Sequence, residues 1–146
     1  MSVVVFDIDG TIADNSHRQH HLMGGKKDWK SYNATMSKDG LIEDVAVLLI
    51  TLAMNNHIIL CTGREEVYRE VTQRWLEEQY LARYAKDIFM RPEKDYRSDA
   101  IVKVELLNAI KAKYVKPWLW FDDRQQVVDA IRAQGIRVLQ VAPGDF

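Results

Sequence analysis

The chain has little cysteine or proline and no long apolar run. Cys61 is the single cysteine among 146 residues, which excludes a disulfide within the chain. This usage suits a reducing compartment, so we expect a cytoplasmic protein in which Cys61 is a small core residue. No basic N-terminal region precedes a long apolar stretch, so we expect neither a signal peptide nor a membrane span. With three prolines, no Pro-rich linker and no repeats, residues 1–146 are expected to form one domain that buries a core.

The chain also has no excess of charge of either sign. It contains 20 Lys and Arg and 21 Asp and Glu, for a net charge of −1. No global basic field therefore attracts nucleic acid, and contact with nucleic acid would need a local basic patch. The Gly-x-x-x-x-Gly-Lys-Ser/Thr pattern that cradles nucleotide phosphates is absent, which excludes a kinase site of that type.

Three apolar runs are each followed directly by polar side chains. They are residues 3–6 before Asp7-Ile8-Asp9-Gly10-Thr11, residues 57–61 before Thr62-Gly63-Arg64, and residues 118–121 before Asp122-Asp123-Arg124. Continuous apolar runs are typical of strands buried on both faces of a parallel sheet, and ligands collect at the carboxyl ends of such strands. Two neighbouring carboxylates repel, so ionising both requires a cation. The arrangement suggests Mg²⁺ beside a carboxylate that attacks phosphorus.

Strand-like and helix-like patterns alternate along the chain. Strands are expected at 3–6, 57–61, 88–90, 118–121 and 137–141, and helices at 41–55, 65–80, 99–113 and 124–134. In the helix over 65–80, Val67, Val71 and Trp75 form one apolar stripe, and Leu48 belongs to the stripe of the helix over 41–55. Gly135 suits the end of the last helix. The alternation predicts an α/β fold, a three-layer Rossmann-like parallel sheet with helices on both faces.

The polar motifs together resemble the haloacid dehalogenase (HAD) superfamily of phosphatases. The matching positions are Asp7-Ile8-Asp9-Gly10-Thr11, Thr62, Lys103 and Asp122-Asp123. More narrowly, the chain resembles the 3′-phosphatase domain of phage polynucleotide kinases, in Arg97-Ser98-Asp99 with Lys103, residues 121–128 and residues 140–146. The resemblance covers almost the whole chain. It implies a HAD-like fold and a Mg²⁺-dependent phosphomonoesterase that acts through an aspartyl-phosphate.

The resemblance gives roles to four carboxylates. Asp7 would be the nucleophile, and Asp9 the general acid and base that protonates the leaving alcohol and then deprotonates water. The metal site would consist of Asp7, Asp122, Asp123 and the backbone carbonyl of Asp9. Asp123 would either bind the metal directly or lie behind the direct ligands. The plainer alternatives are turn residues for Asp7 and Asp9 and a helix N-cap for Asp123.

The resemblance also gives roles to several polar and basic residues. Thr62 would bind phosphoryl oxygens from the start of the following helix, and Lys103 would neutralise phosphoryl charge while pairing with Asp99. Arg18 and Arg64 match, by position, arginines of the phage domain, and would bind a terminal or neighbouring phosphate. The alternatives are a plain turn at Thr62, a solvated helix lysine at Lys103 and an exposed residue at Arg18.

Residues 14–40 interrupt the strand–helix alternation directly after the first strand, where HAD phosphatases insert caps. We expect a small helical flap there, too short to be an independent domain. Its histidines (His17, His20 and His21) suggest either a zinc site or, more simply, residues that touch substrate. Trp29 and Tyr32 suit stacking on a nucleic acid base or, equally, packing of the flap onto the core.

The narrower resemblance implies a phosphate-ester substrate with a 3′-phosphate at a DNA or RNA end, in nucleic acid repair. Because no kinase motif is present, we expect a free-standing phosphatase, with no obligate protein partner and no membrane association. Two alternatives stay open: a phosphatase of free nucleotides or other small phosphomonoesters, and a non-catalytic module that kept the fold.

Overall fold

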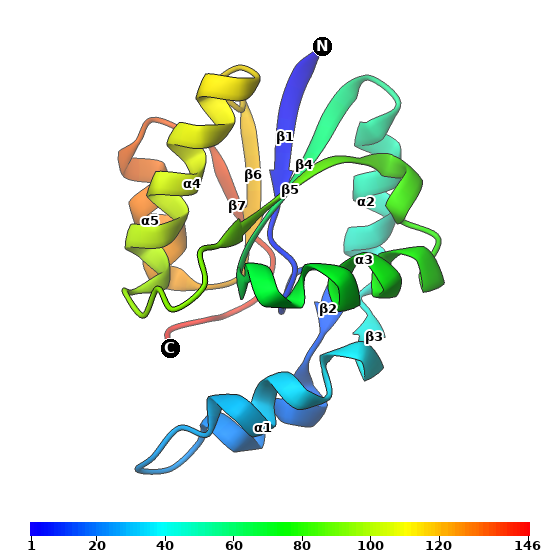
Figure 1. Cartoon of the computed structure of the whole chain (residues 1–146). Coiled ribbons are helices and arrows are strands. Elements are labelled where there is room, and N and C mark those ends of the chain that lie inside the picture. The colour runs from blue at the N-terminus through cyan, green and yellow to red at the C-terminus, as the bar shows by residue number, and fades with distance from the viewer.

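A computed structural model, which describes residues 1–146, places five parallel strands in one sheet between two layers of helices (Figure 1). The strand order is β5-β4-β1-β6-β7, and every neighbouring pair is parallel. The strands are β1 (Ser2–Phe6), β4 (Asn56–Glu65), β5 (Ala85–Arg91), β6 (Leu119–Asp122) and β7 (Val138–Gln140). The parallel α/β fold predicted from the sequence is therefore confirmed.

Helices cover both faces of the sheet. They are α2 (Glu43–Ala53) and α3 (Arg69–Glu78) on one face, and α4 (Asp99–Lys113) and α5 (Gln125–Ala133) on the other (Figure 1). Because side chains alternate along a strand, Val4 and Phe6 pack toward α2 and α3 while Val3 and Val5 pack toward α4 and α5. Both sets are buried, which explains why the strands are apolar without interruption. Cys61 lies buried in the second of these cores, as expected.

Two details of the predicted helices are wrong. β4 continues to Glu65, and a 3₁₀ turn, η3 (Glu66–Tyr68), precedes α3, so the helix begins later than its apolar pattern suggested. Val67 lies on that turn and is 60% exposed. Leu48 is also largely exposed, because α2 packs through Val45, Ala46 and Leu49. In both cases an apolar side chain fits the helical period, but no other element of the fold covers it.

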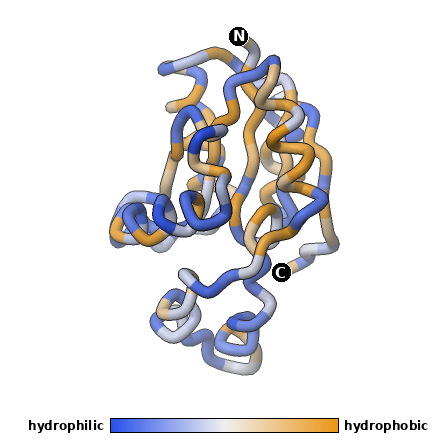
Figure 2. The backbone as a smooth tube through the Cα atoms, turned by 90° about the vertical axis from the view of Figure 1, so that its right-hand side faces the viewer, coloured by the Kyte–Doolittle hydropathy of each residue, from blue (hydrophilic) through white to orange (hydrophobic).

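Residues 14–40, which we call the flap, leave the sheet through a pair of two-residue antiparallel strands, β2 (Ala13–Asp14) and β3 (Gly40–Leu41). Between them lie η1 (Ser16–Leu22), α1 (Trp29–Ala34) and η2 (Met36–Lys38). Figure 1 shows the flap beyond the carboxyl ends of the sheet strands. The flap is mainly hydrophilic, in contrast to the hydrophobic sheet (Figure 2).

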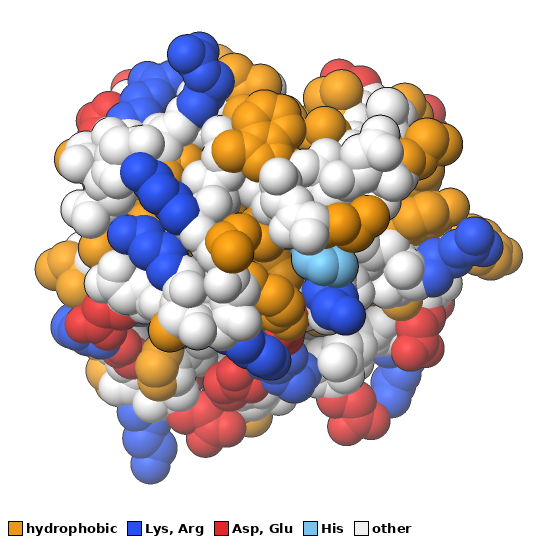
Figure 3. Space-filling model, turned by 90° about the horizontal axis from the view of Figure 1, so that it is seen from above, with side chains coloured by type: hydrophobic (Ala, Val, Ile, Leu, Met, Phe, Trp, Pro, Cys, Tyr) orange, Lys and Arg blue, Asp and Glu red, His pale blue; other side chains and the backbone are white.

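The opposite end of the molecule, where the sheet strands begin, has a different surface. Met1, Met54 and Trp118 are exposed there, each just before a strand. Figure 3 looks onto this end and shows hydrophobic side chains among Lys and Arg. Across the whole chain, no helix combines the length and apolar character that crossing a membrane requires.

Candidate active site

Three buried carboxylates meet at the carboxyl ends of β1 and β6. Asp7 follows β1, Asp122 ends β6 and Asp123 comes next, and because the two strands are paired their ends lie together. One carboxylate oxygen from each lies within 4.8 Å of the others. Burial, and then the charge of Asp122, raise the pKa of Asp7 well above its usual range and that of Asp123 to about 6. This concentration of negative charge favours a bound cation.

Lys103 supplies one positive charge to this cluster from α4. Its Nζ lies 2.6 Å from Asp7 Oδ1 and 2.8 Å from Asp122 Oδ2, and its side chain is 1% exposed. Burial alone would lower the pKa of Lys103, but Asp122 and Asp7 outweigh burial and raise it. The Thr11 hydroxyl donates to the other oxygen of Asp7 at 3.0 Å. The Asp7 carboxylate is thus held from both sides, and Lys103 is not a solvated helix lysine.

The donor set of the cluster fits a hard divalent cation. Three carboxylates face a single ammonium, and oxygen ligands at this spacing are those that Mg²⁺ prefers. Asp122 is held in place by the backbone N–H of Asp123, which donates to its Oδ1 at 2.9 Å, and by the Trp120 indole N–H, which donates to its Oδ2 at 3.2 Å. Asp7, Asp122 and Asp123 are therefore the residues that could hold a metal ion.

Asp9 lies apart from this cluster. Its Oδ1 is 2.7 Å from Arg18 Nη2 and 2.7 Å from Arg64 Nη2. Burial raises the pKa of Asp9, but the charges of Arg64 and Arg18 outweigh that effect and lower it. Alternation along an extended strand would put Asp7 and Asp9 on the same side. β1 ends at Phe6, however, and the loop after it directs Asp7 toward α4 and Asp9 toward the flap. The Asp9 carboxylate is not among the grouped metal-ligand candidates.

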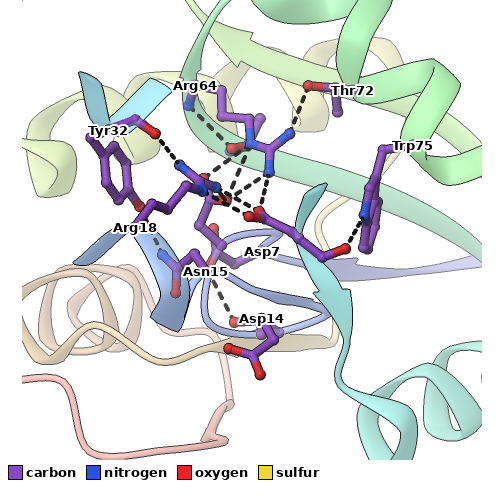
Figure 4. A network of polar contacts seen from close by, with 12 residues as sticks. Asp7, Asp14, Asn15, Arg18, Tyr32, Arg64, Thr72 and Trp75 are labelled. Atoms are coloured by element: carbon purple, nitrogen blue, oxygen red, sulfur yellow. Dashed lines mark hydrogen bonds and ion pairs between the residues drawn. The ribbon is translucent and has the colours of Figure 1, made fainter. Parts of the chain in front are cut away.

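A second acid, Asp39, completes a buried clamp with the two arginines. Its carboxylate accepts from Arg18 at 2.8 Å (Nε) and 2.6 Å (Nη2), and from Arg64 Nη2 at 3.2 Å. Figure 4 shows the Arg18 and Arg64 guanidinium groups converging from the flap and from β4. The Arg18 side chain is 0% exposed, so the alternative of an exposed flap residue is wrong. The arginine clamp, as we call Arg18, Arg64, Asp9 and Asp39, balances two positive and two negative charges.

Residues of α3 and the flap hold the clamp in position. Arg64 Nη1 donates to the Thr72 hydroxyl at 3.0 Å, and the Trp75 indole N–H donates to the Asp39 carbonyl at 2.8 Å (Figure 4). The ring of Tyr32 lies against the Arg18 guanidinium, 4.3 Å from ring centroid to Cζ. Tyr32 thereby packs inside the flap, while Trp29 remains half exposed.

The histidines of the flap do not gather into a metal site. His17 Nε2 lies 2.8 Å from Asp39 Oδ1, at the edge of the arginine clamp. The rings of His20 and His21 lie against each other instead, with centroids 3.9 Å apart. The acidic cluster is the only group of three or more candidate ligands in the chain.

Thr62 and Asp99 were also predicted to belong to the site. Because β4 runs on to Glu65, Thr62 lies in a strand and not at the start of a helix, and its hydroxyl accepts from the Arg64 backbone N–H at 3.1 Å. Asp99 is the first residue of α4. Its Oδ2 lies 3.8 Å from Lys103 Nζ, and its Oδ1 lies 3.2 Å from Arg91 Nη2. A Cβ at Gly63 would collide with the Asp99 carboxylate, which would then have to move.

The C-terminal segment supports the loop that carries Asp123. The backbone N–H of Gln125 donates to the Gly144 carbonyl at 2.6 Å, and a Cβ at Gly144 would collide with the Asp123 backbone. Arg124, not Asp123, is the N-cap position of α5, and no side chain caps that helix. The alternative role of Asp123 as a capping residue is therefore wrong. Sequence reasoning missed Asp39 and Thr72, and it gave no role to Gly144, although residues 140–146 belong to the resemblance.

Comparison with known proteins shows which family the chain matches. The family model described as the polynucleotide kinase PNKP phosphatase domain matches residues 1–146. A protein of Autographa californica nuclear polyhedrosis virus, described as a putative bifunctional polynucleotide kinase/RNA ligase, is 30% identical over 129 residues, which are 86% of this chain and 17% of the viral protein.

Solved structures show the same fold. A chain of a Pnkp1/Rnl/Hen1 complex is 34% identical with a TM-score of 0.83, over 99% of this chain and 46% of that chain. A haloacid dehalogenase-like hydrolase from Streptococcus pneumoniae has a TM-score of 0.69 at 14% identity, over 96% of this chain and 84% of that one. The chain thus spans less than half the length of the viral relative and of the chain in the complex.

Proposed function

Because the chain belongs to the polynucleotide kinase PNKP phosphatase domain family, a family of HAD phosphatases, we propose that it removes 3′-phosphates from nucleic acid ends. The reaction would be Mg²⁺-dependent and would pass through an aspartyl-phosphate on Asp7. One observation carries this proposal, the arrangement of the charged side chains. The buried Asp7 carboxylate is held between Lys103 and Thr11 and lies beside two further acids. A pair of arginines surrounds Asp9.

The chemistry divides into two displacements. In the first, an Asp7 oxygen forms a bond to phosphorus while the bond to the 3′-oxygen of the sugar breaks, and Asp9 gives that oxygen a proton. In the second, Asp9 takes a proton from water, whose oxygen attacks the same phosphorus and releases inorganic phosphate and Asp7. The hydrogen bond from Thr11 and the charge of Lys103 hold the attacking carboxylate in one orientation throughout.

The arginine clamp accounts for how Asp9 gains the proton it must give. Without substrate, Arg64 and Arg18 keep the pKa of Asp9 low, and the carboxylate stays ionised. A bound phosphate competes for the same two guanidinium groups and brings its own negative charge. Both changes raise the pKa of Asp9, so substrate binding itself favours the protonated acid that the leaving oxygen needs.

Charge neutralisation at the phosphoryl group would come from two sources. Asp7, Asp122 and Asp123 would hold Mg²⁺, which offsets negative charge on the phosphoryl oxygens when it is bound. Lys103 lies 2.6 Å from Asp7 and so stands beside the attacked phosphorus. The Thr62 hydroxyl, in the last half of β4, would donate to a phosphoryl oxygen.

A substrate with more than one phosphate group suits the arginines. A single transferring phosphoryl group would be served by the cation site and Lys103, whereas Arg18 and Arg64 form a second, buried pair of forked donors on the flap side. A second phosphate would bind them by displacing their present carboxylate partners, Asp9 and Asp39. The names of two relatives, a polynucleotide kinase/RNA ligase and a Pnkp1/Rnl/Hen1 complex, support a polynucleotide substrate. The rival substrate is a free nucleotide, which the small size of the flap permits.

A substrate panel at fixed Mg²⁺ tests the proposal. It compares a 3′-phosphorylated oligonucleotide, a nucleoside 3′-monophosphate and an aryl phosphate, with Asp7→Asn protein as the blank. We expect the highest kcat/KM for the oligonucleotide. A kcat/KM for the mononucleotide equal to or above that of the oligonucleotide would favour a free nucleotide as the substrate. If none of the three compounds showed Asp7-dependent hydrolysis, the result would favour the alternative of a non-catalytic module. Activity of the purified chain alone also tests the expectation that no protein partner is required.

A further inference from the structure

The outer end of the flap, residues 20–30, presents side chains that nothing in the fold requires; we call it the flap tip. Met23 is 72% exposed and Trp29 is 49% exposed. A Cβ at Gly24 or Gly25 would meet no atom within 4 Å, so the turn lies in open space. In Figure 1 this turn is the part of the flap farthest from the sheet. Trp29 therefore presents an accessible indole at the outer end of a polar arm, where a ligand can contact it.

The flap tip is positively charged on a chain whose net charge is −1. Lys26, Lys27 and Lys30 are all exposed. The only acid among them, Asp28, is occupied at both oxygens, which accept from the backbone N–H of Ser31 at 3.1 Å and from its hydroxyl at 2.7 Å. The three ammonium groups therefore form the kind of local basic patch that a neutral protein needs to bind nucleic acid.

Trp29 is held in a defined position by its neighbours. Its ring lies edge-on to Tyr32, with centroids 5.6 Å apart and planes at 89°, and Lys27 Nζ is 5.8 Å from its centroid. The other contact of the Tyr32 ring is Arg18, which reaches Asp9 at 2.7 Å. A continuous series of side chains thus connects Trp29 at the flap tip with Asp9 in the candidate active site.

We propose that the flap tip binds the single-stranded segment that leads to the phosphorylated end, with a base stacked on Trp29 and backbone phosphates on Lys26, Lys27 and Lys30. The inference rests on the proposed function and adds to it a second contact region outside the chemical centre. Aromatic side chains interleaved with basic ones are the elements by which proteins bind single strands without reading their sequence. A mononucleotide lacks the backbone phosphates that the three lysines would bind.

Binding is measured on Asp7→Asn protein, so that turnover does not interfere. The probe is a short 3′-phosphorylated oligothymidylate, and the signals are quenching of tryptophan fluorescence and the Kd at several salt concentrations. We expect Trp29→Ala to raise Kd about 5- to 150-fold, the range for loss of one stacked base, and to remove most of the quenching. Trp29→Phe, which keeps a ring, should restore part of the affinity. Replacing Lys26, Lys27 and Lys30 by alanine should lower the slope of log Kd against log salt by about 0.7 for each backbone phosphate that the lysines neutralise.

Trp118 offers a matched control, because it is 50% exposed and lies at the opposite end of the sheet. Trp118→Ala should leave Kd and the quenching unchanged. Unchanged Kd in Trp29→Ala protein that melts like its parent would overturn the inference, as would a strand that binds no better than a mononucleotide. Failure of the proposed function looks different: the wild-type protein would not hydrolyse the 3′-phosphate, whatever the flap tip binds.

Discussion

The sheet and the flap hold buried charge in different ways. At the sheet, Asp7, Asp122 and Lys103 come from two paired strands and a long helix, each fixed by the apolar core on either face. At the flap, Arg18 lies on the short 3₁₀ helix η1 and Asp39 lies between η2 and β3, in a segment joined to the core by two-residue strands. The first region has excess negative charge, and the second is balanced. Under the proposed function, attack on phosphorus belongs to the sheet cluster, while Asp9 connects the proton transfers to the arginines of the flap side.

The sharpest way to separate the two regions is to remove the nucleophile. Asp7→Asn keeps the volume of the side chain but removes the charge that attacks phosphorus. We expect kcat to fall at least about 1,000-fold on every substrate, since the loss is in the chemistry itself. Steady-state assays on an aryl phosphate and a 3′-phosphorylated oligonucleotide measure the fall. Asp129→Asn, on the exposed face of α5, is the control and should be neutral; near wild-type activity of folded Asp7→Asn protein would disprove the covalent mechanism.

Removal of metal should also affect both substrates alike. Because three carboxylates outnumber the single ammonium of Lys103, we expect chelation to lower activity by about 100-fold or more, with recovery on addition of Mg²⁺. Ca²⁺ should restore little, since it prefers more ligands at longer distances. Activity is followed during titration with chelator and then with each ion. Full activity in thoroughly chelated protein would remove the cation from the mechanism.

Loss of the arginines should distinguish substrates. Arg18→Ala and Arg64→Ala each remove a charged donor worth about 1.5–3 kcal/mol, so kcat/KM on a 3′-phosphorylated oligonucleotide should fall roughly 10- to 150-fold. The loss on an aryl phosphate should be smaller, because that substrate has no second phosphate to bind. Parallel assays with both substrates make the comparison. Small and equal losses on the two would place these residues outside the site.

Asp39→Asn should weaken the flap and leave the sheet cluster intact. The two guanidinium groups would then share one carboxylate in a buried place, which costs on the order of 3 kcal/mol of folding free energy. We expect a lower denaturant midpoint and a fall of about 10-fold in oligonucleotide kcat/KM, with aryl phosphate hydrolysis little changed. Asp129→Asn again serves as the control for stability. A variant as stable and as active as the wild type would show that Asp39 does not position the arginines.

The sequence predicted the sheet region well because its signals are local. Apolar runs marked the strands, and Gly135, expected to end α5, has a positive φ of 79°. The HAD-like pattern indicated Asp7, Lys103 and Asp122, which the structure brings within contact distance. These residues follow strands or lie on a helix with clear periodicity, so their placement follows once the fold is known.

The flap region was predicted less well, and for a physical reason. Its helical turns are short and polar, so no hydrophobic period shows where they lie. Asp39 contacts Arg18 and Arg64, which belong to separate segments, and no spacing in the sequence links the three. Trp75 was expected only as a core residue, but its indole N–H also binds the Asp39 carbonyl. Such contacts arise from tertiary packing and become visible only in the structure.

The central position of β1 has a consequence for how the protein reaches its native state. β1 comes first in the chain, yet Val4 pairs with Ile58 on one side and with Leu119 on the other. Native contacts between residues so far apart in sequence slow folding, because chain entropy is lost before the pairing repays it. During synthesis β1 leaves the ribosome long before its second partner exists, and an unpaired apolar strand is prone to aggregate. The yield of active protein should therefore depend on folding rate and chaperones more than on the stability of the finished fold.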